Sequence, residues 1–146
     1  MSVDQPVASD QGKMWALLSY ASFFFMFPLG VIPLLQRDDP FALYHAKHAT
    51  AVWLVWFVSS TLLTVLYSVI TFVTCGFGGL LFPIILLPLP WVMIVGVHGA
   101  ILSMNGEWAE PIGGFGLGEI LFKSIQLKSA DAPPQLPPSP PPPPVG

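Results

Sequence analysis

The chain has 146 residues, of which 53% are hydrophobic and only 9% are charged, whereas about a quarter of the residues in soluble domains are charged. No Asp, Glu, Lys or Arg occurs between Met14 and Gln36 or between Ala49 and Gly106. These tracts exclude an ordinary soluble enzyme domain and predict membrane-spanning helices of about 20 residues each. Five basic against eight acidic residues exclude a nucleic-acid binder, and the single Cys75 excludes a disulfide scaffold.

The first uncharged tract predicts one transmembrane helix over about residues 14–35, after a flexible N-terminus of residues 1–13. The tract is too long for the core of a cleaved signal peptide, and acidic residues precede it, so we expect the span to be retained. Pro28, Gly30 and Pro33 lie in its second half. Because each proline removes a backbone donor, this half is predicted to be kinked.

A second helix is predicted to begin at Asp39 and Pro40, because aspartate caps helix N-termini and proline suits the first helical position. The helix that follows is too long for a single bilayer crossing. We therefore expect residues 41–49 to lie among the lipid headgroups and residues 50–73 to form the second span.

The sequence CGFGG at residues 75–79 predicts a turn, because glycine readily adopts the backbone angles that tight turns need. A third span is expected at about residues 80–104. Three prolines interrupt its first half. A bent but complete crossing is the favoured interpretation, and a broken or re-entrant segment at residues 80–90 is the alternative.

Apolar residues at helical spacing predict an interfacial amphipathic helix over residues 117–128, which completes a membrane domain of residues 14–128. A proline-rich tail, residues 129–146, follows and is expected to be disordered. We interpret this tail as a solvated spacer, with a ligand for partners that read polyproline II as the alternative. The apolar residues of the predicted helix are Leu117, Ile120, Leu121 and Ile125.

The distribution of Lys and Arg predicts an orientation, because cytoplasmic loops carry an excess of both. With three spans, the side of the N-terminus carries Lys13 alone and the other side carries four basic residues. We therefore expect a multi-pass protein of the bacterial inner membrane with its N-terminus outside and its C-terminus in the cytoplasm. The four residues are Arg37, Lys47, Lys123 and Lys128.

The polar segment RDDPFALYHAKH, residues 37–48, is the first candidate site. His45 and His48 share one face of the predicted helix, and Asp38 and Asp39 lie one loop away, so together they are weak candidates for a divalent metal site. We favour the alternative, in which the polar residues anchor the helix at the membrane surface. No metal or other cofactor is therefore predicted.

His98 is the only ionisable side chain deep in the second uncharged tract, and an intramembrane ionisable residue is a functional candidate by default. We favour a neutral imidazole that is hydrogen-bonded to a hydroxyl of the preceding span and holds two helices together. No nucleophile, base and orienting residue can be combined, so no catalytic residue and no enzymatic activity is predicted. The available hydroxyls are those of Ser59, Ser60, Thr61, Thr64 and Ser68.

Residues 19–57 contain an apolar helix that ends in PLL, an R-D-D turn, an aromatic-H-A-K segment and a tryptophan-rich helix. This pattern resembles the small membrane-protein family of the magnetosome proteins MamF and MmsF. The later NGEWAEPI looks more like uncharacterised bacterial relatives, which are similar to Tic20-like subunits of the chloroplast import translocon. The positions that carry these resemblances are Pro33, Leu34, Leu35, Arg37, Asp38, Asp39, Tyr44, His45, Ala46, Lys47, Trp53, Trp56, Asn105, Gly106, Trp108 and Pro111.

The resemblance implies an integral membrane protein of three or four helices without known enzymatic activity, of a kind that in the magnetosome branch influences the growth of magnetite crystals. We expect a protein that works by packing its helices against itself or against partner membrane proteins, with the magnetosome membrane as a less favoured location. A translocation or transport element that uses His98 and the proline-broken third span is the alternative. Metal or mineral handling is a third hypothesis.

Overall fold

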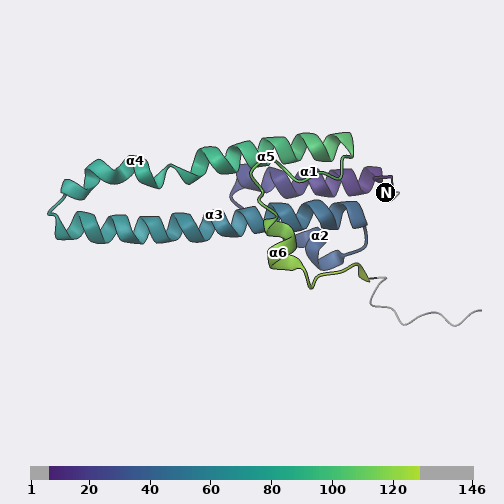
Figure 1. Ribbon diagram of the computed structural model, residues 1–146, viewed down its shortest axis with the longest axis horizontal. Coiled ribbons are helices and arrows are strands. Elements are labelled where there is room, and N and C mark those ends of the chain that lie inside the picture. The colour runs from purple at the N-terminus through teal and green to yellow at the C-terminus, as the bar shows by residue number, and fades with distance from the viewer. Residues whose placement is uncertain (1–6, 129–146) are drawn as a thin grey trace, which may run out of the picture.

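The computed structural model describes residues 7–128, and this part of the chain contains helices and no strands, as predicted (Figure 1). The predicted proline-rich tail lies outside the described residues. Pro83 and Pro88 each lie in the first turn of a helix. Backbone amides of the first turn have no acceptor within the helix, so proline's lack of an amide hydrogen breaks no helical hydrogen bond there. The helices are α1 (Asp10–Phe25), α2 (Val31–Gln36), α3 (Pro40–Val73), η1 (Phe77–Leu81), α4 (Phe82–Ile85), α5 (Pro88–Asn105) and α6 (Leu117–Phe122).

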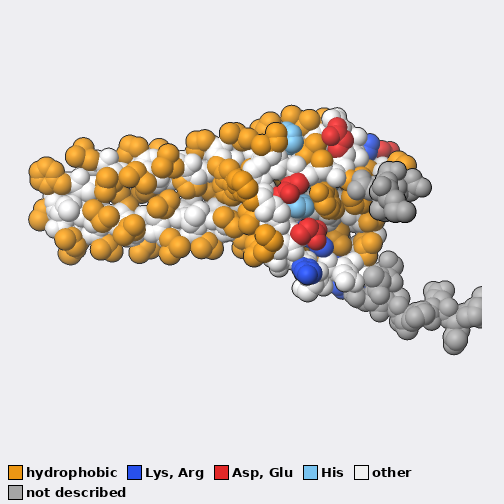
Figure 2. All heavy atoms as spheres, in the orientation of Figure 1, with side chains coloured by type: hydrophobic (Ala, Val, Ile, Leu, Met, Phe, Trp, Pro, Cys, Tyr) orange, Lys and Arg blue, Asp and Glu red, His pale blue; other side chains and the backbone are white. Residues whose placement is uncertain are grey.

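The molecule has two parts, which we call the head and the arm. The head comprises residues 7–52 and 92–128, where α1, α2 and α6 pack around the start of α3 and the end of α5. The arm, residues 53–91, contains the rest of α3 and the returning η1, α4 and start of α5, and it has no Asp, Glu, Lys, Arg or His. Figure 2 shows hydrophobic side chains along the arm, with the charged side chains gathered on the head.

The predicted start of the long helix is confirmed. The Asp39 carboxylate accepts a hydrogen bond from the backbone amide of Ala42 at 2.9 Å, and Pro40 occupies the first turn. The 34 residues of α3 extend about 51 Å, which exceeds a hydrocarbon core of about 30 Å. Residues 41–49 do not lie at a lipid-facing surface, because α1, α2, α5 and α6 bury most of them inside the head.

The prediction of one continuous span over residues 14–35 is wrong. Helix α1 ends at Phe25, Met26 adopts a left-handed backbone with φ of 54°, and the chain turns back into α2. Pro28 supplies the physical reason, since proline disfavours the helical conformation of the residue before it and lacks an amide hydrogen. Because the Ser9 hydroxyl donates to Asp39 Oδ2 at 2.6 Å, both ends of this segment lie at the same end of the molecule.

The arm confirms the predicted turn at residues 75–79 and the proline bend that follows it. Cys75 and Gly76 have φ of 51° and 101°, and the helical path is interrupted at residues 86–87 between α4 and α5. Pro40–Val73 and Phe77–Asn105 are each long and apolar enough to cross a membrane. The structure therefore has two such segments within residues 7–128 rather than the predicted three, and residues 80–90 are broken into short helices, as one part of the alternative interpretation had it.

Helix α6 is shorter than the predicted helix over residues 117–128, because it ends at Phe122. Its predicted apolar face is only partly buried: Leu117 and Ile125 pack against the head, whereas Ile120 is 69% exposed and Leu121 is 49% exposed. The closest approach to α3 is at Gly118, where an added Cβ would lie 2.7 Å from the backbone nitrogen of His48. This glycine contact adds to the packing of Leu117 and Phe122 against the head.

Candidate functional site

The head brings together two segments that lie far apart in the sequence, residues 37–48 and residues 105–111. Trp108 packs against Phe41 and Tyr44, with ring centroids 5.2 Å and 5.7 Å apart. The loop after α5 thus covers the first turns of α3, and the motif positions of both segments contribute to one polar and aromatic cluster. We call this group the head cluster; its members are Tyr20, Phe41, Tyr44, His45, His48, Glu107, Trp108 and Glu110.

His45 is the centre of the head cluster, and its side chain is completely buried. Its Nε2 lies 3.0 Å from the backbone oxygen of Glu107, which can only accept, so Nε2 carries a hydrogen and donates. The neutral ring then presents a lone pair on Nδ1, which accepts from the Tyr20 hydroxyl at 3.2 Å. His45 therefore links α1, α3 and the loop after α5 through one defined tautomer.

His48 lies one helical turn further along α3 and is 2% exposed. Neither of its ring nitrogens has a hydrogen-bond partner, and Nδ1 lies 4.0 Å from Oε1 of Glu110. The neighbouring Lys47 Nζ lies 3.9 Å from Oε1 of Glu119 on α6. Both carboxylates come from the segment after α5, so they place negative charge beside the histidine face of α3.

Burial controls the protonation of both histidines, which lie in the part of α3 inside the head. It lowers the pKa of His45 from 6.5 to about 4, since the charged ring would lose its hydration there. It also lowers the pKa of His48, although the carboxylates of Glu110 and Glu119 act in the opposite direction. Both rings are neutral at pH 7, and the hydrogen bond from His45 to Glu107 does not need a positive charge.

We expect the head to lose stability as the pH falls from about 6.5 toward 4. Between about pH 6.5 and pH 4, His45 is protonated in the unfolded chain but not in the folded chain. Lowering the pH through this range therefore lowers the free energy of unfolding, by about 3 kcal/mol for His45. Unfolding in detergent, followed by tryptophan fluorescence across this pH range, measures the loss. His45→Gln removes the titrating group, and a loss of the same size in that variant would contradict the assignment.

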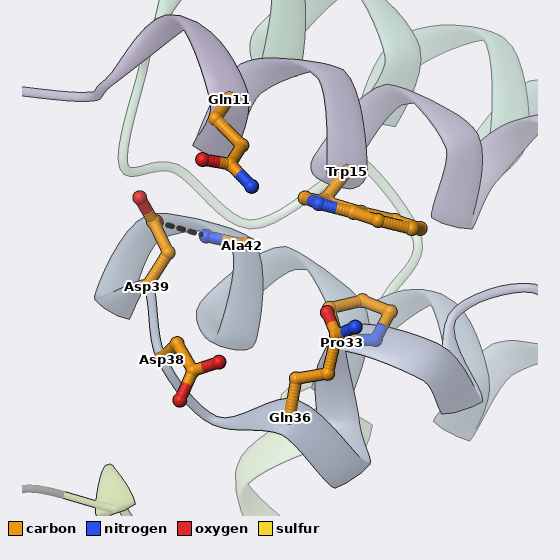
Figure 3. A pocket seen from close by; sticks show the side chains of 7 residues that line it. All are labelled: Gln11, Trp15, Pro33, Gln36, Asp38, Asp39 and Ala42. Carbon is orange, nitrogen blue, oxygen red and sulfur yellow. Dashed lines mark hydrogen bonds between the residues drawn. The ribbon is translucent and has the colours of Figure 1, made fainter.

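Asp39 and Asp38 occupy the loop between α2 and α3 and have different surroundings. The Asp39 carboxylate caps α3 and accepts from Ser9, and an added Cβ on Gly12 would lie 2.6 Å from its Oδ1. Asp38 is exposed at the edge of a cavity of about 180 Å³ between α1, α2 and the start of α3 (Figure 3). The cavity is lined by Gln11, Trp15, Pro33, Gln36, Asp38, Asp39 and Ala42.

Arg37 ends α2 in the left-handed conformation, with φ of 55°. Its guanidinium donates to the backbone oxygen of Gln126 at 3.4 Å, and its own backbone oxygen accepts from the amide of Lys128 at 3.1 Å. Asp39 thus links the start of α1 to the start of α3, and Arg37 links the segment after α6 to the end of α2. Two residues of the R-D-D motif therefore connect parts of the head that lie far apart in the sequence.

The four weak metal candidates do not form a metal site. Asp39 is used as a helix cap, and both nitrogens of His45 are hydrogen-bonded. Within residues 7–128, no three His, Cys, Asp or Glu side chains are placed to hold a metal ion. The other two candidates lie elsewhere: Asp38 is in the exposed loop between α2 and α3, and His48 is beside Glu110. The side chains at these positions are arranged to pack and cap.

Asn105 and Gly106 form the turn that ends α5. Gly106 has φ of 75°, and the Asn105 amide donates to Oε1 of Glu107 at 3.0 Å. An added Cβ on Gly106 would lie 2.9 Å from Cε of Lys13, so the start of α1 covers this turn. The turn directs the chain back across the head, where the Glu107 backbone oxygen accepts the hydrogen bond from His45 Nε2.

His98 does not meet the hydroxyl row on α3, so its predicted partner is wrong. Nδ1 of His98 accepts from the backbone amide of Ile112 at 3.1 Å, which places the ring in the head. In the arm, most of the serine and threonine hydroxyls donate hydrogen bonds to backbone oxygens of their own helix, as these residues do in apolar surroundings. Ser59, Thr61, Thr64 and Ser68 donate to the backbone oxygens of Trp56, Phe57, Ser60 and Thr64, respectively.

Sequence reasoning missed Tyr20, which is central to the head. The Tyr20 ring is fully buried, and an added Cβ on Gly99 would lie 2.3 Å from its Cε1. The available signal was a tyrosine inside an apolar helix, because a buried hydroxyl needs a partner. Gly96 and Gly99 of α5 leave the space that Phe23 and Tyr20 of α1 occupy.

The fold and the head cluster define an all-helical protein with two segments able to cross a membrane and a compact, charged head at one end. The chain belongs to the MamF_MmsF family, described as the magnetosome magnetite crystal formation protein family, which it matches over residues 11–114. The matched range includes the head cluster and the arm and ends before α6. No curated protein matches the chain, and no solved structure does so either.

Proposed function

We propose that this chain is a non-enzymatic, multi-pass membrane protein of the magnetosome type. Its arm crosses the bilayer as a two-helix hairpin, and its head works as an assembly surface for copies of the chain or for partner membrane proteins. The observation that carries this proposal is the arm itself, in which large apolar side chains are exposed throughout and no charged side chain occurs.

The dimensions of the arm support a bilayer crossing. Residues 53–73 of α3 extend about 31 Å, close to the roughly 30 Å of a hydrocarbon core. Four hydroxyls of this segment, those of Ser59, Thr61, Thr64 and Ser68, donate to their own backbone, as polar groups inside lipid require. Trp53, Trp56 and Trp91 lie where the arm meets the head, and tryptophan is enriched at membrane interfaces.

The basic residues support a cytoplasmic head. All five Lys and Arg of the chain lie in the head, and the far end of the arm carries none. Since cytoplasmic segments are rich in these residues, we infer that the head faces the cytoplasm and the turn at residues 75–79 faces the opposite side. This differs from the orientation expected from three spans, because α1 and α2 return to the head.

Exposed apolar side chains support an assembly role for the head. Ile112, Phe115 and Ile120 are 65%, 75% and 69% exposed, in the loop before α6 and on α6 itself. Exposed apolar groups beside charged ones are typical of protein contact surfaces. The hydrogen-bonded and capping roles of the motif residues support a structural rather than a catalytic function for the head cluster.

The membrane part of the proposal is tested by placing charge on the arm. Leu66 and Val69 are exposed near the middle of the crossing, and Leu66→Lys/Val69→Lys should leave most of the chain extractable from membranes by alkaline carbonate. Each lysine costs about 2.5 to 3.5 kcal/mol at a bilayer centre. Met14→Lys, at an exposed apolar position of the head, should stay in the membrane; equal extraction of both variants would contradict the proposal.

The assembly part is tested separately by cross-linking in mild detergent. Phe115→Ser/Ile120→Ser removes two exposed apolar side chains from the head without touching the head cluster. We expect the fraction of chain recovered in oligomers or with partner membrane proteins to fall. An unchanged fraction, with the variant still folded and membrane-bound, would exclude this part of the head as the assembly surface.

A further inference from the structure

The turn between α1 and α2 exposes four consecutive apolar residues. Phe24, Phe25, Met26 and Phe27 are 59%, 72%, 64% and 62% exposed, and we call them the hairpin tip. Water would contact most of this apolar surface if the head lay wholly outside the bilayer, and exposing large apolar side chains to water is unfavourable. The tip therefore needs an apolar environment that the rest of residues 7–128 does not supply.

The hairpin tip points toward the arm, while both ends of the hairpin stay at the charged end of the head. Its start is hydrogen-bonded to the loop before α3, through Ser9 and Asp39. Its return is packed against α3, since an added Cβ on Gly30 would lie 2.7 Å from Oγ1 of Thr50. The chain thus enters from the charged end, turns at the tip and leaves by the same end.

The core contacts of α1 fix how far the tip reaches. Phe23, the residue before the tip, packs in one cluster with Val52 and Val95, and Trp53 and Trp56 lie against that cluster. Measured along α3, this level lies roughly 4 to 10 Å past Ala49, where the uncharged tract begins. It coincides with the tryptophans at the junction of head and arm, at the depth where interfacial apolar groups insert.

We propose that α1 and α2 form a re-entrant hairpin whose tip inserts into the acyl chains of the head-side leaflet alone. This inference rests on the proposed function, since it needs the arm to cross the bilayer. The tip fills part of the head-side leaflet beside α3 and α5, whereas of residues 7–128 only the arm reaches the other leaflet (Figure 1). The membrane domain is therefore wider on the head side and fits a membrane that is convex toward the head.

Lipid fits the hairpin tip better than a second copy of the chain. Four consecutive side chains around a turn point in different directions, so a flat protein surface would contact only some of them. Acyl chains surround such a tip on all sides. At the start of the arm, Leu54 and Phe57 of α3 are exposed as well, so apolar surface for lipid is present on the arm at the level just past Val52.

The depth of the tip is tested with the full chain in phosphatidylcholine vesicles that carry nitroxide labels at the headgroup, high on the acyl chain or deep on it. A fluorophore is attached to a single cysteine at Phe25→Cys in a Cys75→Ser background. We expect the shallow acyl-chain label to quench it most strongly. Leu66→Cys, in the middle of the arm, should be quenched by the deep label, and Val7→Cys by aqueous iodide.

Each outcome of this experiment has one meaning. Quenching of the Phe25 probe by iodide, with the Leu66 probe still quenched by the deep label, would overturn the hairpin proposal and leave the membrane crossing intact. Loss of lipid quenching at Leu66 would overturn the proposed function instead. A Phe25 probe that neither iodide nor any lipid label quenches would show a protein partner, and cysteine cross-linking between copies at this position would identify a second copy.

The shape of the membrane domain is tested by its orientation in vesicles of different size. With Val7→Cys and a membrane-impermeant maleimide, a larger fraction of heads should face outward in small sonicated vesicles than in large extruded ones. Phe24→Ser/Phe25→Ser/Phe27→Ser should abolish this difference. A matched control, Phe72→Ser/Val73→Ser/Phe77→Ser at the far end of the arm, should retain it; equal effects of the two triple variants would overturn the proposal.

Discussion

Cysteines placed near the two ends of the described chain should react with a membrane-impermeant maleimide from the same side of the bilayer, and native Cys75 should react from the other side. Val7 and Lys128 are exposed on the head, and Cys75 is exposed at the far end of the arm. A bilayer of about 30 Å separates these two ends if the arm crosses it. Val7→Cys and Lys128→Cys are each made in a Cys75→Ser chain, so that one thiol is measured at a time.

Labelling of intact cells measures exposure on the outer face of the membrane, and labelling of inverted membrane vesicles measures exposure on the cytoplasmic face. We expect Val7→Cys and Lys128→Cys to label only in the inverted vesicles, where the cytoplasmic face is accessible. Three spans would instead place residue 7 and Cys75 on one side and residue 128 on the other. That pattern would refute the hairpin topology, and detergent-solubilised protein, in which all three positions should react, controls for buried thiols.

The error in the predicted first span has a clear physical origin. An apolar tract of this length predicts a crossing by composition, and its prolines and glycine were interpreted only as a kink. The structure instead reverses the chain at Met26 and returns it through α2. The reversal is stabilised by contacts far away in the sequence, such as that between Ser9 and Asp39, and no local pattern encodes such a pair.

Local signals predicted the other elements well. The start of α3 follows from an aspartate cap and a first-turn proline, and the turn at residues 75–79 follows from glycine. The end of α6 was missed because Leu117, Ile120, Leu121 and Ile125 have helical spacing, yet Ile120 and Leu121 remain exposed. Periodicity predicts a face only when another element exists to cover it.

The sequence predicted some residues of the head cluster but not their arrangement. Tyr44, His45, Lys47 and Trp108 were all identified as motif positions. The interpretation of the polar residues of segment 37–48 as surface anchors does not hold for His45 and His48, which are buried. Trp108 and the Glu107 backbone oxygen cover α3 there from a segment some sixty residues later, and His45 Nε2 donates to Glu107. A polar residue near a membrane surface and one inside a small protein core give the same sequence pattern.

Replacing Gly99 with alanine should destabilise the head more than any other single methyl group added at the glycines of α5. An added Cβ would lie 2.3, 2.5 and 2.6 Å from three atoms of the Tyr20 ring. This ring cannot swing aside, because it is fully buried and its hydroxyl donates to His45. Overpacking of a filled core typically costs about 1 to 3 kcal/mol, and we expect the upper part of that range.

Gly79→Ala is the matched control for this prediction, since no atom lies within 4 Å of the Cβ that it would add. Its effect should stay within about 0.5 kcal/mol, as for surface substitutions elsewhere. Chemical unfolding in detergent, followed by tryptophan fluorescence, compares the two variants, because Trp91 and Trp108 report on the packing around α5 and α3. Equal stability of Gly99→Ala and Gly79→Ala would mean that α1 does not pack against α5 through Tyr20, and the shared core that holds the hairpin in the head would then be wrong.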